Sequence, residues 1–446
     1  RKDLRMPKTF LSIAVNSAIA TIVTTAVWFA VTFWLFLETR SVTATSVLAS
    51  IYLVIVAGSG FLLGSIVDRF KQKTSFVVST LVSLGFYLLA ALLFVMNPSS
   101  SFTSASSVML WIFLSLTLLG SIAGNVRNIV LSTLVTIMIA EDQRDRANGL
   151  IGAINGSAFL IASVISGVVI GFFGMFWMLA ASCTLLLLLT LHAASLPLPA
   201  APHHHEPTVH AERQRVDLRG TLRAISLIPG LFGLIFFQTF NNFLGGVFMA
   251  LMDAYGLSLV SVQTWGFLWG MLSLAMILGG MFVSRYGLGP HPLRRLFQIN
   301  MITWTVCIFF TIQSSVILLS IGIFTWMALM PMAEAAEQTI LQKVIPLERQ
   351  GRVFGFAQSV EQSASPLTAF CIGPITDLFF IPFMTTGAGA AAIGSWYGVG
   401  PERGMALVFS IAGLLGLLVT LVAMRSRSYR LLSKLYADDE PQPAFA

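Results

Sequence analysis

The stretch Gly64-Ser-Ile-Val-Asp-Arg-Phe-Lys-Gln-Lys73 covers the end of a long apolar run at 45–67 and the turn before the next one at 74–96. A helix needs roughly 20 apolar residues to cross the hydrocarbon core of a bilayer, and both runs reach that length. The stretch between them carries an aspartate, an arginine and two lysines, which are costly to place in that core. The sequence therefore predicts two membrane-spanning helices that are joined by a short charged turn.

The same alternation of apolar runs and short charged turns continues along the chain. Hydrophobic residues make up 56% of the 446 residues and charged residues only 10%, whereas a soluble domain carries about a quarter charged residues. This composition predicts an all-α membrane protein with twelve transmembrane helices. The predicted spans lie near 10–37, 45–67, 74–96, 107–139, 147–171, 173–195, 226–252, 259–284, 296–312, 316–342, 353–384 and 403–424.

A polar stretch at 196–225 divides these spans into two sets of six. It contains four prolines and the run His203–His205, and such a composition is typical of a flexible linker. The histidine run could suggest a metal site, but a tract of this kind more often binds nothing specific, so neither a metal nor another cofactor is expected. We expect an N-terminal six-helix bundle at 1–195, a cytoplasmic linker at 196–225, a C-terminal six-helix bundle at 226–424 and a cytoplasmic tail at 425–446.

The two sets of six spans repeat each other. A short charged turn follows the fourth span at 142–149, and a similar turn follows the tenth span at 348–355. In each turn an arginine, Arg146 or Arg352, stands three residues before a glycine that opens the next helix. Duplication of a six-helix unit predicts two pseudo-symmetric bundles that rock about a site at the bilayer midplane, as in secondary transporters.

The basic residues gather on one side of the predicted membrane. With the N-terminus placed in the cytoplasm, all of the 26 Lys and Arg residues fall in cytoplasmic segments except Arg40, Arg127 and Arg403. This positive-inside pattern predicts a multi-pass protein of the inner (plasma) membrane with both termini in the cytoplasm. It also accounts for the net charge of +7 without a nucleic-acid partner, because basic loops can rest against anionic lipid head groups.

The charged turn from Gly64 to Lys73 resembles the loop signature of the major facilitator superfamily. In that signature a Gly, an Asp-Arg pair and basic residues lie between the second and third spans. The turn departs from the usual pattern at Lys71, where Gly is common, and at Gln72, where a basic residue is common. The resemblance extends over the whole chain in span count, linker and duplication, and it implies the major facilitator fold.

Two further segments, Arg146-Ala-Asn-Gly-Leu150 and 358–366, are similar to the drug:proton antiporter branch that includes macrolide efflux proteins and the enterobactin exporter. This resemblance implies a secondary transporter that exports an amphipathic organic compound, such as a drug, a macrolide-like or a siderophore-like molecule, in exchange for protons. The protein would work as a monomer in the lipid bilayer. A lysophospholipid or lipid translocator and a proton-coupled uptake symporter remain open as alternatives.

The resemblance also implies a role for the charged turn. Asp68 would meet the N-terminus of the eleventh helix near 351–353, where unpaired backbone amides favour an anion. The contact would latch the two halves together on the cytoplasmic side. Alternatively, the turn is simply solvated and its basic residues serve membrane topology. The residues of the implied latch are Gly64, Asp68, Arg69, Lys71 and Lys73.

Polar and ionisable residues inside the spans are the candidates for a transport site, because lipid cannot solvate them. Glu334 and Glu337 lie three residues apart and share a helix face, and a carboxyl group in a desolvated place suits reversible proton binding. Arg127 suits a counter-ion or an anion-binding role, although Arg127 and a glutamate could instead form a structural pair. The predicted proton-coupling and substrate residues are Glu334, Glu337, Glu361, Arg127, Asn241, Asn242, Gln238, Gln358 and Gln362.

Two other acids, Asp253 and Asp377, fall near the ends of predicted spans, and we expect them to be rim residues. An intramembrane enzyme is not favoured, because His192 is the only histidine near a span and no nucleophile–base or metal-ligand spacing stands out. A phosphate-binding loop is also missing from the sequence, which argues against ATP-driven transport within this chain. The sequence thus favours a secondary transporter.

Overall fold

The computed structural model describes residues 7–69, 71–139, 144–196, 222, 225–345 and 347–437. Side chains are described throughout these ranges except at 57–69, 125, 128, 129, 132, 133, 135–137, 144–156, 284, 342, 347–352, 354, 355, 358, 436 and 437. Most of the predicted linker, including His203–His205, therefore lies outside the described residues.

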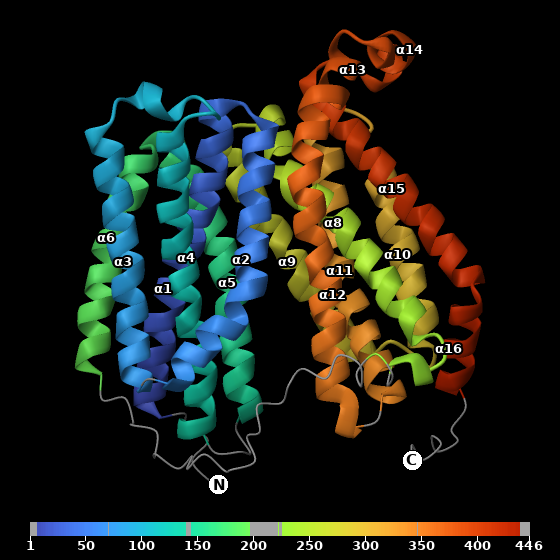
Figure 1. Ribbon diagram of the computed structural model, residues 1–446, viewed down its shortest axis with the longest axis horizontal. Coiled ribbons are helices and arrows are strands. Elements are labelled where there is room, and N and C mark those ends of the chain that lie inside the picture. The colour runs from blue at the N-terminus through green and yellow to red at the C-terminus, as the bar shows by residue number, and fades with distance from the viewer. Residues whose placement is uncertain are drawn as a thin grey trace. The chain divides into compact units, whose positions relative to one another are not determined.

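The chain divides into two compact units. Unit 1 consists of residues 1–206 together with 252–273, and unit 2 consists of 207–251 together with 274–446. A one-turn helix, η1 (Ser99–Phe102), joins two of the helices of unit 1. The long helices of the first half of the chain are α1 (Lys8–Thr39), α2 (Val42–Arg69), α3 (Gln72–Met96), α4 (Val108–Met138), α5 (Arg144–Phe172) and α6 (Met175–Ser195) (Figure 1).

In the second half of the chain, α8 (Leu231–Leu259) and α9 (Val262–Tyr286) each begin in one unit and end in the other. The remaining long helices are α10 (Pro292–Phe309), α11 (Val316–Val344), α12 (Leu347–Ile375) and α15 (Pro401–Arg425). The short elements are the π-helix η3 (Thr376–Phe380), α13 (Ile381–Thr385), α14 (Ala388–Tyr397) and α16 (Arg427–Ala437).

Over the described residues, eight helices are long and apolar enough to cross a membrane. Shorter apolar helical runs lie at Val42–Val56, Val108–Gly124 and Ser157–Phe172. The other long helix, α10, opens with two arginines after Pro292 and Leu293, so its apolar part is short. The prediction of an all-helical membrane protein is confirmed.

The distribution of side chains on α3 is the reverse of that in a soluble protein. Its buried positions include Ser75, Ser79, Thr80 and Ser83. Water would favour polar residues on the outside, whereas lipid favours apolar ones. We therefore assign the exposed face of α3 to the lipid. The exposed large hydrophobic side chains of this helix are Val78, Leu81, Val82, Leu88, Leu89, Leu92, Val95 and Met96.

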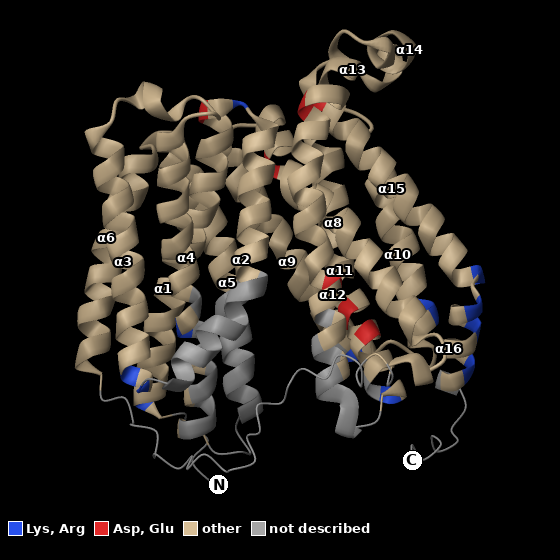
Figure 2. Ribbon diagram, in the orientation of Figure 1, with Lys and Arg blue, Asp and Glu red and all other residues tan. Residues whose placement is uncertain are grey.

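Part of the predicted tail forms the amphipathic helix α16. Leu432 on its apolar face is buried in a core that α8, α10, α11 and α12 also line. The approach is close at Gly230, where an added Cβ would lie 2.3 Å from the carbonyl oxygen of Ser428. The opposite face of α16 exposes Arg427, Arg430 and Lys434 (blue in Figure 2).

The predicted span at 353–384 is not one α-helix. Its α-helical part ends at Ile375, and the chain continues through η3 and α13 into α14, which was not predicted. Gly398 and Gly400, with φ values of 97° and 140°, make the turn from α14 into α15, and such backbone angles favour glycine.

Arg403, at the start of α15, holds this end of unit 2 together. Its side chain is 1% exposed and lies over the ring of Tyr397, with 4.4 Å between the guanidinium carbon and the ring centroid. Its Nε donates to the carbonyl oxygen of Tyr397 (2.6 Å), and Nη2 donates to those of Thr311 and Ile312 (2.9 Å each). The guanidinium group therefore ties the α10–α11 loop and the end of α14 to α15.

Replacement of Arg403 by Gln is expected to lower the free energy of unfolding by about 3 kcal/mol, because buried carbonyl groups lose their donors. The measurement is thermal melting of the purified protein, followed by the loss of helical signal. Arg403→Lys restores one donor, so its melting temperature should lie between those of the wild type and Arg403→Gln. A melting temperature equal to that of the wild type would contradict the assigned role.

Candidate functional site

A chain of hydrogen bonds crosses the interior of unit 2. Trp304 on α10 donates its indole Nε1 to Oδ1 of Asn241 (2.9 Å), and Asn241 donates Nδ2 to Oε1 of Gln238 (3.0 Å). Gln238 in turn donates its Nε2 to Oε2 of Glu337 on α11. The carboxyl groups of Glu337 and Glu361, on α12, are within hydrogen-bonding reach of each other. We call this set of five residues the carboxyl network.

The two ends of the carboxyl network differ in chemistry. At one end Trp304 and Asn241 are neutral, whereas the other end has two adjacent acids. A hydrogen bond between two carboxyl groups requires a proton on one of them. One further oxygen on each acid, Oε1 of Glu337 and Oε1 of Glu361, is buried without a hydrogen-bond partner. We call Glu337 and Glu361 the acid pair. Each of them has an unpartnered acceptor oxygen that can bind a proton or a cation.

Close helix packing places the carboxyl network. An added Cβ on Gly246 would lie 2.4 Å from the carbonyl oxygen of Ser365, so only glycine allows α8 to approach α12 this closely. Ser365 then donates Oγ to the carbonyl oxygen of Asn242 (2.7 Å). α11 and α12 contain Pro331 and Pro366 within their helices. Figure 2 shows the acidic positions of these two helices in red.

The structure brings together only some of the predicted site residues. Glu337, Glu361, Gln238 and Asn241 share the carboxyl network, and Asn242 donates Nδ2 to the backbone oxygen of Gln238 (3.0 Å).

Two of the predicted residues on α11 and α12, Glu334 and Gln362, are exposed and form no hydrogen bond with the carboxyl network among the described side chains. Glu334 nevertheless lies close enough to Glu337 for its charge to act on that acid. The side chain of Gln358 lies outside the described residues.

Arg127 belongs to a different network, in unit 1. Its side chain on α4 is 2% exposed, and its two Nη groups donate to Oγ1 of Thr80 and Oδ1 of Asn16. The guanidinium carbon lies 3.9 Å from the ring centroid of Phe76. Asn16 continues the network to His192, with 2.8 Å between its Nδ2 and the His192 Nδ1. Among the described side chains, no carboxylate pairs with Arg127, and its Nε finds no acceptor.

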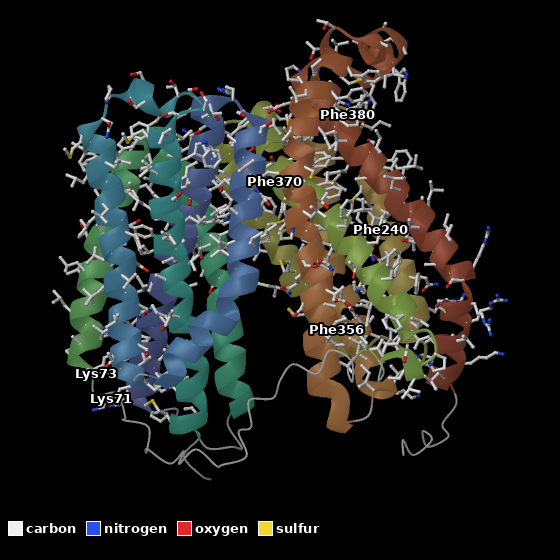
Figure 3. All side chains as sticks on the ribbon, in the orientation of Figure 1. Lys71, Lys73, Phe240, Phe356, Phe370 and Phe380 are labelled. Atoms are coloured by element: carbon white, nitrogen blue, oxygen red, sulfur yellow. The ribbon has the colours of Figure 1, made fainter. Side chains whose placement is uncertain are left out.

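The residues of the implied latch are only partly described. Lys71, which is exposed, and Lys73 lie at the start of α3 (Figure 3). The side chains of Gly64, Asp68 and Arg69 lie outside the described residues, so the latch remains a prediction.

Sequence reasoning missed several partners in both networks. Trp304, Asn16 and Thr80 were not singled out. One signal was available, since Asn16 is an amide within the first predicted span, at 10–37. Over the described residues, no group of three His, Cys, Asp or Glu side chains is arranged to hold a metal ion.

Comparison with known proteins identifies the fold. The sequence model of the Major Facilitator Superfamily matches residues 13–369. A bacterial homologue of the human lysosomal transporter Spinster is 14% identical over 100% of both chains, with a TM-score of 0.64. The nucleoside transporter NupG is 13% identical over 93% of this chain and 99% of its own, with a TM-score of 0.63. A D-xylose–proton symporter is 14% identical over 93% and 95%, with a TM-score of 0.61. No curated protein sequence matches the chain.

Proposed function

Because this chain belongs to the Major Facilitator Superfamily and is a secondary transporter rather than an enzyme, we propose that it exports an amphipathic organic cation in exchange for protons. The observation that carries the proposal is the carboxyl network, in which Glu337 and Glu361 adjoin each other on neighbouring helices. Acids within spans are costly and are retained where a transported ion or proton needs them.

The proposed cycle uses the acid pair in two charge states. With one proton the pair is held by its internal hydrogen bond, and with none it presents two negative charges that attract a cation. Protons entering from the acidic side would displace the cation there, and loss of protons on the other side would allow the next cation to bind. Binding of proton and substrate in competition is sufficient for exchange by alternating access.

The neutral part of the carboxyl network supports the same proposal. Gln238 donates to the acid pair through its amide nitrogen, so it stabilises a charged carboxylate without adding a competing positive charge. Asn241 and Trp304 fix the orientation of that amide through its oxygen. Glu337 therefore keeps one donor in place when it loses its proton.

Membrane orientation is part of the proposal. We place both termini in the cytoplasm of a cell whose plasma (inner) membrane holds the protein, since all but three of the 26 basic residues then lie on the cytoplasmic side. The two six-helix bundles, at 1–195 and 226–424, and the latch at Asp68 are proposed on the sequence pattern alone.

The test is accumulation of a fluorescent lipophilic cation by proteoliposomes whose lumen is about two pH units more acidic than the bath. One-to-one exchange should concentrate the dye up to roughly 100-fold, since each pH unit is worth about 1.36 kcal/mol. A protonophore should reduce accumulation to that of protein-free vesicles.

Two other outcomes would indicate a different function. Accumulation of the dye only with an alkaline lumen would indicate an uptake symporter. Movement of a fluorescent lysophospholipid regardless of the pH gradient would indicate a lipid translocator.

A further inference from the structure

A carboxyl group outside the carboxyl network lies in unit 1, near the turn between α8 and α9. Trp265 donates its indole Nε1 to Oδ1 of Asp253 (2.9 Å), and Trp269 donates its Nε1 to the same oxygen (2.8 Å). Asp253 is half-buried and lies six residues before the end of α8, so the expectation that it is a rim residue stays a prediction. α8 continues to Leu259, past the predicted end of the span at 252, and two tryptophans of α9 reach the Asp253 carboxylate, which stays half-buried.

The spacing of the two tryptophans along α9 places both indole groups next to Asp253. Trp265 and Trp269 are four residues apart, so they lie on one face of α9, and their ring centroids are 5.7 Å apart in an edge-to-face arrangement. Trp265 is 1% exposed. Gly256 provides the space for it, because an added Cβ there would lie 2.4 Å from the indole ring.

The described side chains around Asp253 are uncharged. From α9 it receives the two indole groups, and Gln263 of the same helix turns to Gly171 on α5. From α5, Phe159 packs edge-to-face on Trp269, with 6.2 Å between ring centroids. Among the described side chains, no other ionisable group acts on Asp253.

The two oxygens of Asp253 have different environments. Oδ1 accepts both indole bonds, whereas no donor of the described residues reaches Oδ2. A proton can therefore add at Oδ2 while both indole bonds to Oδ1 stay in place. The site accommodates the charged and the neutral acid in one geometry, and no described side chain supplies a counter-ion to balance a negative charge here.

We propose that Asp253, with Trp265 and Trp269, forms a second proton-binding site of the protein, in addition to the acid pair of unit 2. The bound species is a single proton at Oδ2. The indole pair serves as the hydrogen-bonding support of the acid, and its emission reports the charge. This site stands independently of the proposed export function, because its occupancy can be measured without any substrate.

The test is a pH titration of tryptophan fluorescence, on full-length protein in lipid nanodiscs. A Trp304→Phe background is used because Trp304 donates to the carboxyl network and could report its titration. Loss of a charge next to two indole groups should shift their emission, so this background should show a one-proton transition within the pH range in which the protein stays folded. Asp253→Asn keeps an acceptor oxygen but carries no charge, and it should hold the emission at its low-pH position throughout.

Two further variants make the outcome decisive. Trp269→Phe removes one reporter and should reduce the amplitude by about half, and this variant serves if Asp253→Asn does not fold. Glu361→Gln should leave the transition in place. Constant emission across the pH range, or an Asp253→Asn titration that matches its parent, would overturn the second site.

Discussion

Replacement of Glu337 by Gln is expected to abolish the substrate gradient that the protein sustains across a pH difference. At one proton per substrate and no membrane potential, about two pH units store about 2.7 kcal/mol and sustain roughly a 100-fold gradient. Gln keeps the size of the side chain and can still accept a hydrogen bond from Gln238, but it cannot exchange a proton. The variant should therefore only equilibrate substrate, a loss of about 100-fold in the accumulation ratio.

The measurement is dye accumulation in proteoliposomes, with the wild type and the variant reconstituted at equal density. Glu334→Gln is the matched control, since Glu334 lies on the same helix, is exposed and stays outside the carboxyl network. It should retain most of the accumulation. Full pH-driven accumulation by Glu337→Gln would show that Glu337 is structural, and the proposed exchange through the acid pair would then fail.

The acid pair should also behave as one unit. Glu361→Gln removes the other carboxyl group and should cause a loss similar to that of Glu337→Gln. If one proton is shared, the double variant should be no worse than either single variant, because groups that act as a unit are strongly non-additive. Losses that multiply would indicate two independent proton sites instead of a shared one.

The fold could be predicted from the sequence because its two signals are local. An apolar run of about 20 residues and a charged turn can each be recognised in the local sequence, without information on distant parts of the chain. The elements that were missed lack these signals. α14 is a short, uncharged helix within a loop, and α16 is too polar to resemble a span.

The site was only half predictable for a related reason. Helical spacing places Glu334 and Glu337 on one face, but it does not say which of the two meets a neighbouring helix. That choice depends on packing between distant segments, such as the close approach of α8 and α12 at Gly246. The structure brings Glu337 and Glu361 together and leaves Glu334 exposed.

The two buried arginines, Arg403 and Arg127, differ in the groups to which they donate hydrogen bonds. Arg403 donates to three backbone carbonyl oxygens, all in segments that it fastens together. Arg127 donates to two side chains and leaves its Nε without an acceptor. A buried guanidinium without a carboxylate carries a desolvation cost of several kcal/mol, which its hydrogen bonds and the ring of Phe76 offset only in part. We propose that this group has a role in transport.

Replacement of Arg127 by Gln is therefore expected to separate stability from activity. The variant loses an unfavourable buried charge and keeps an amide that can donate to Asn16 or Thr80, so its free energy of unfolding should stay equal or rise by about 1 kcal/mol. Transport should fall at least tenfold, which corresponds to about 1.4 kcal/mol in the barrier. Melting curves and initial transport rates measured on one preparation give both quantities. Arg403→Gln is the matched control and should show the reverse. Its free energy of unfolding should fall, because the buried hydrogen bonds of Arg403 are lost, whereas transport by the folded protein should be maintained. If Arg127→Gln melts as early as Arg403→Gln while its folded fraction transports normally, then Arg127 is a structural residue and its charge has no part in the transport cycle.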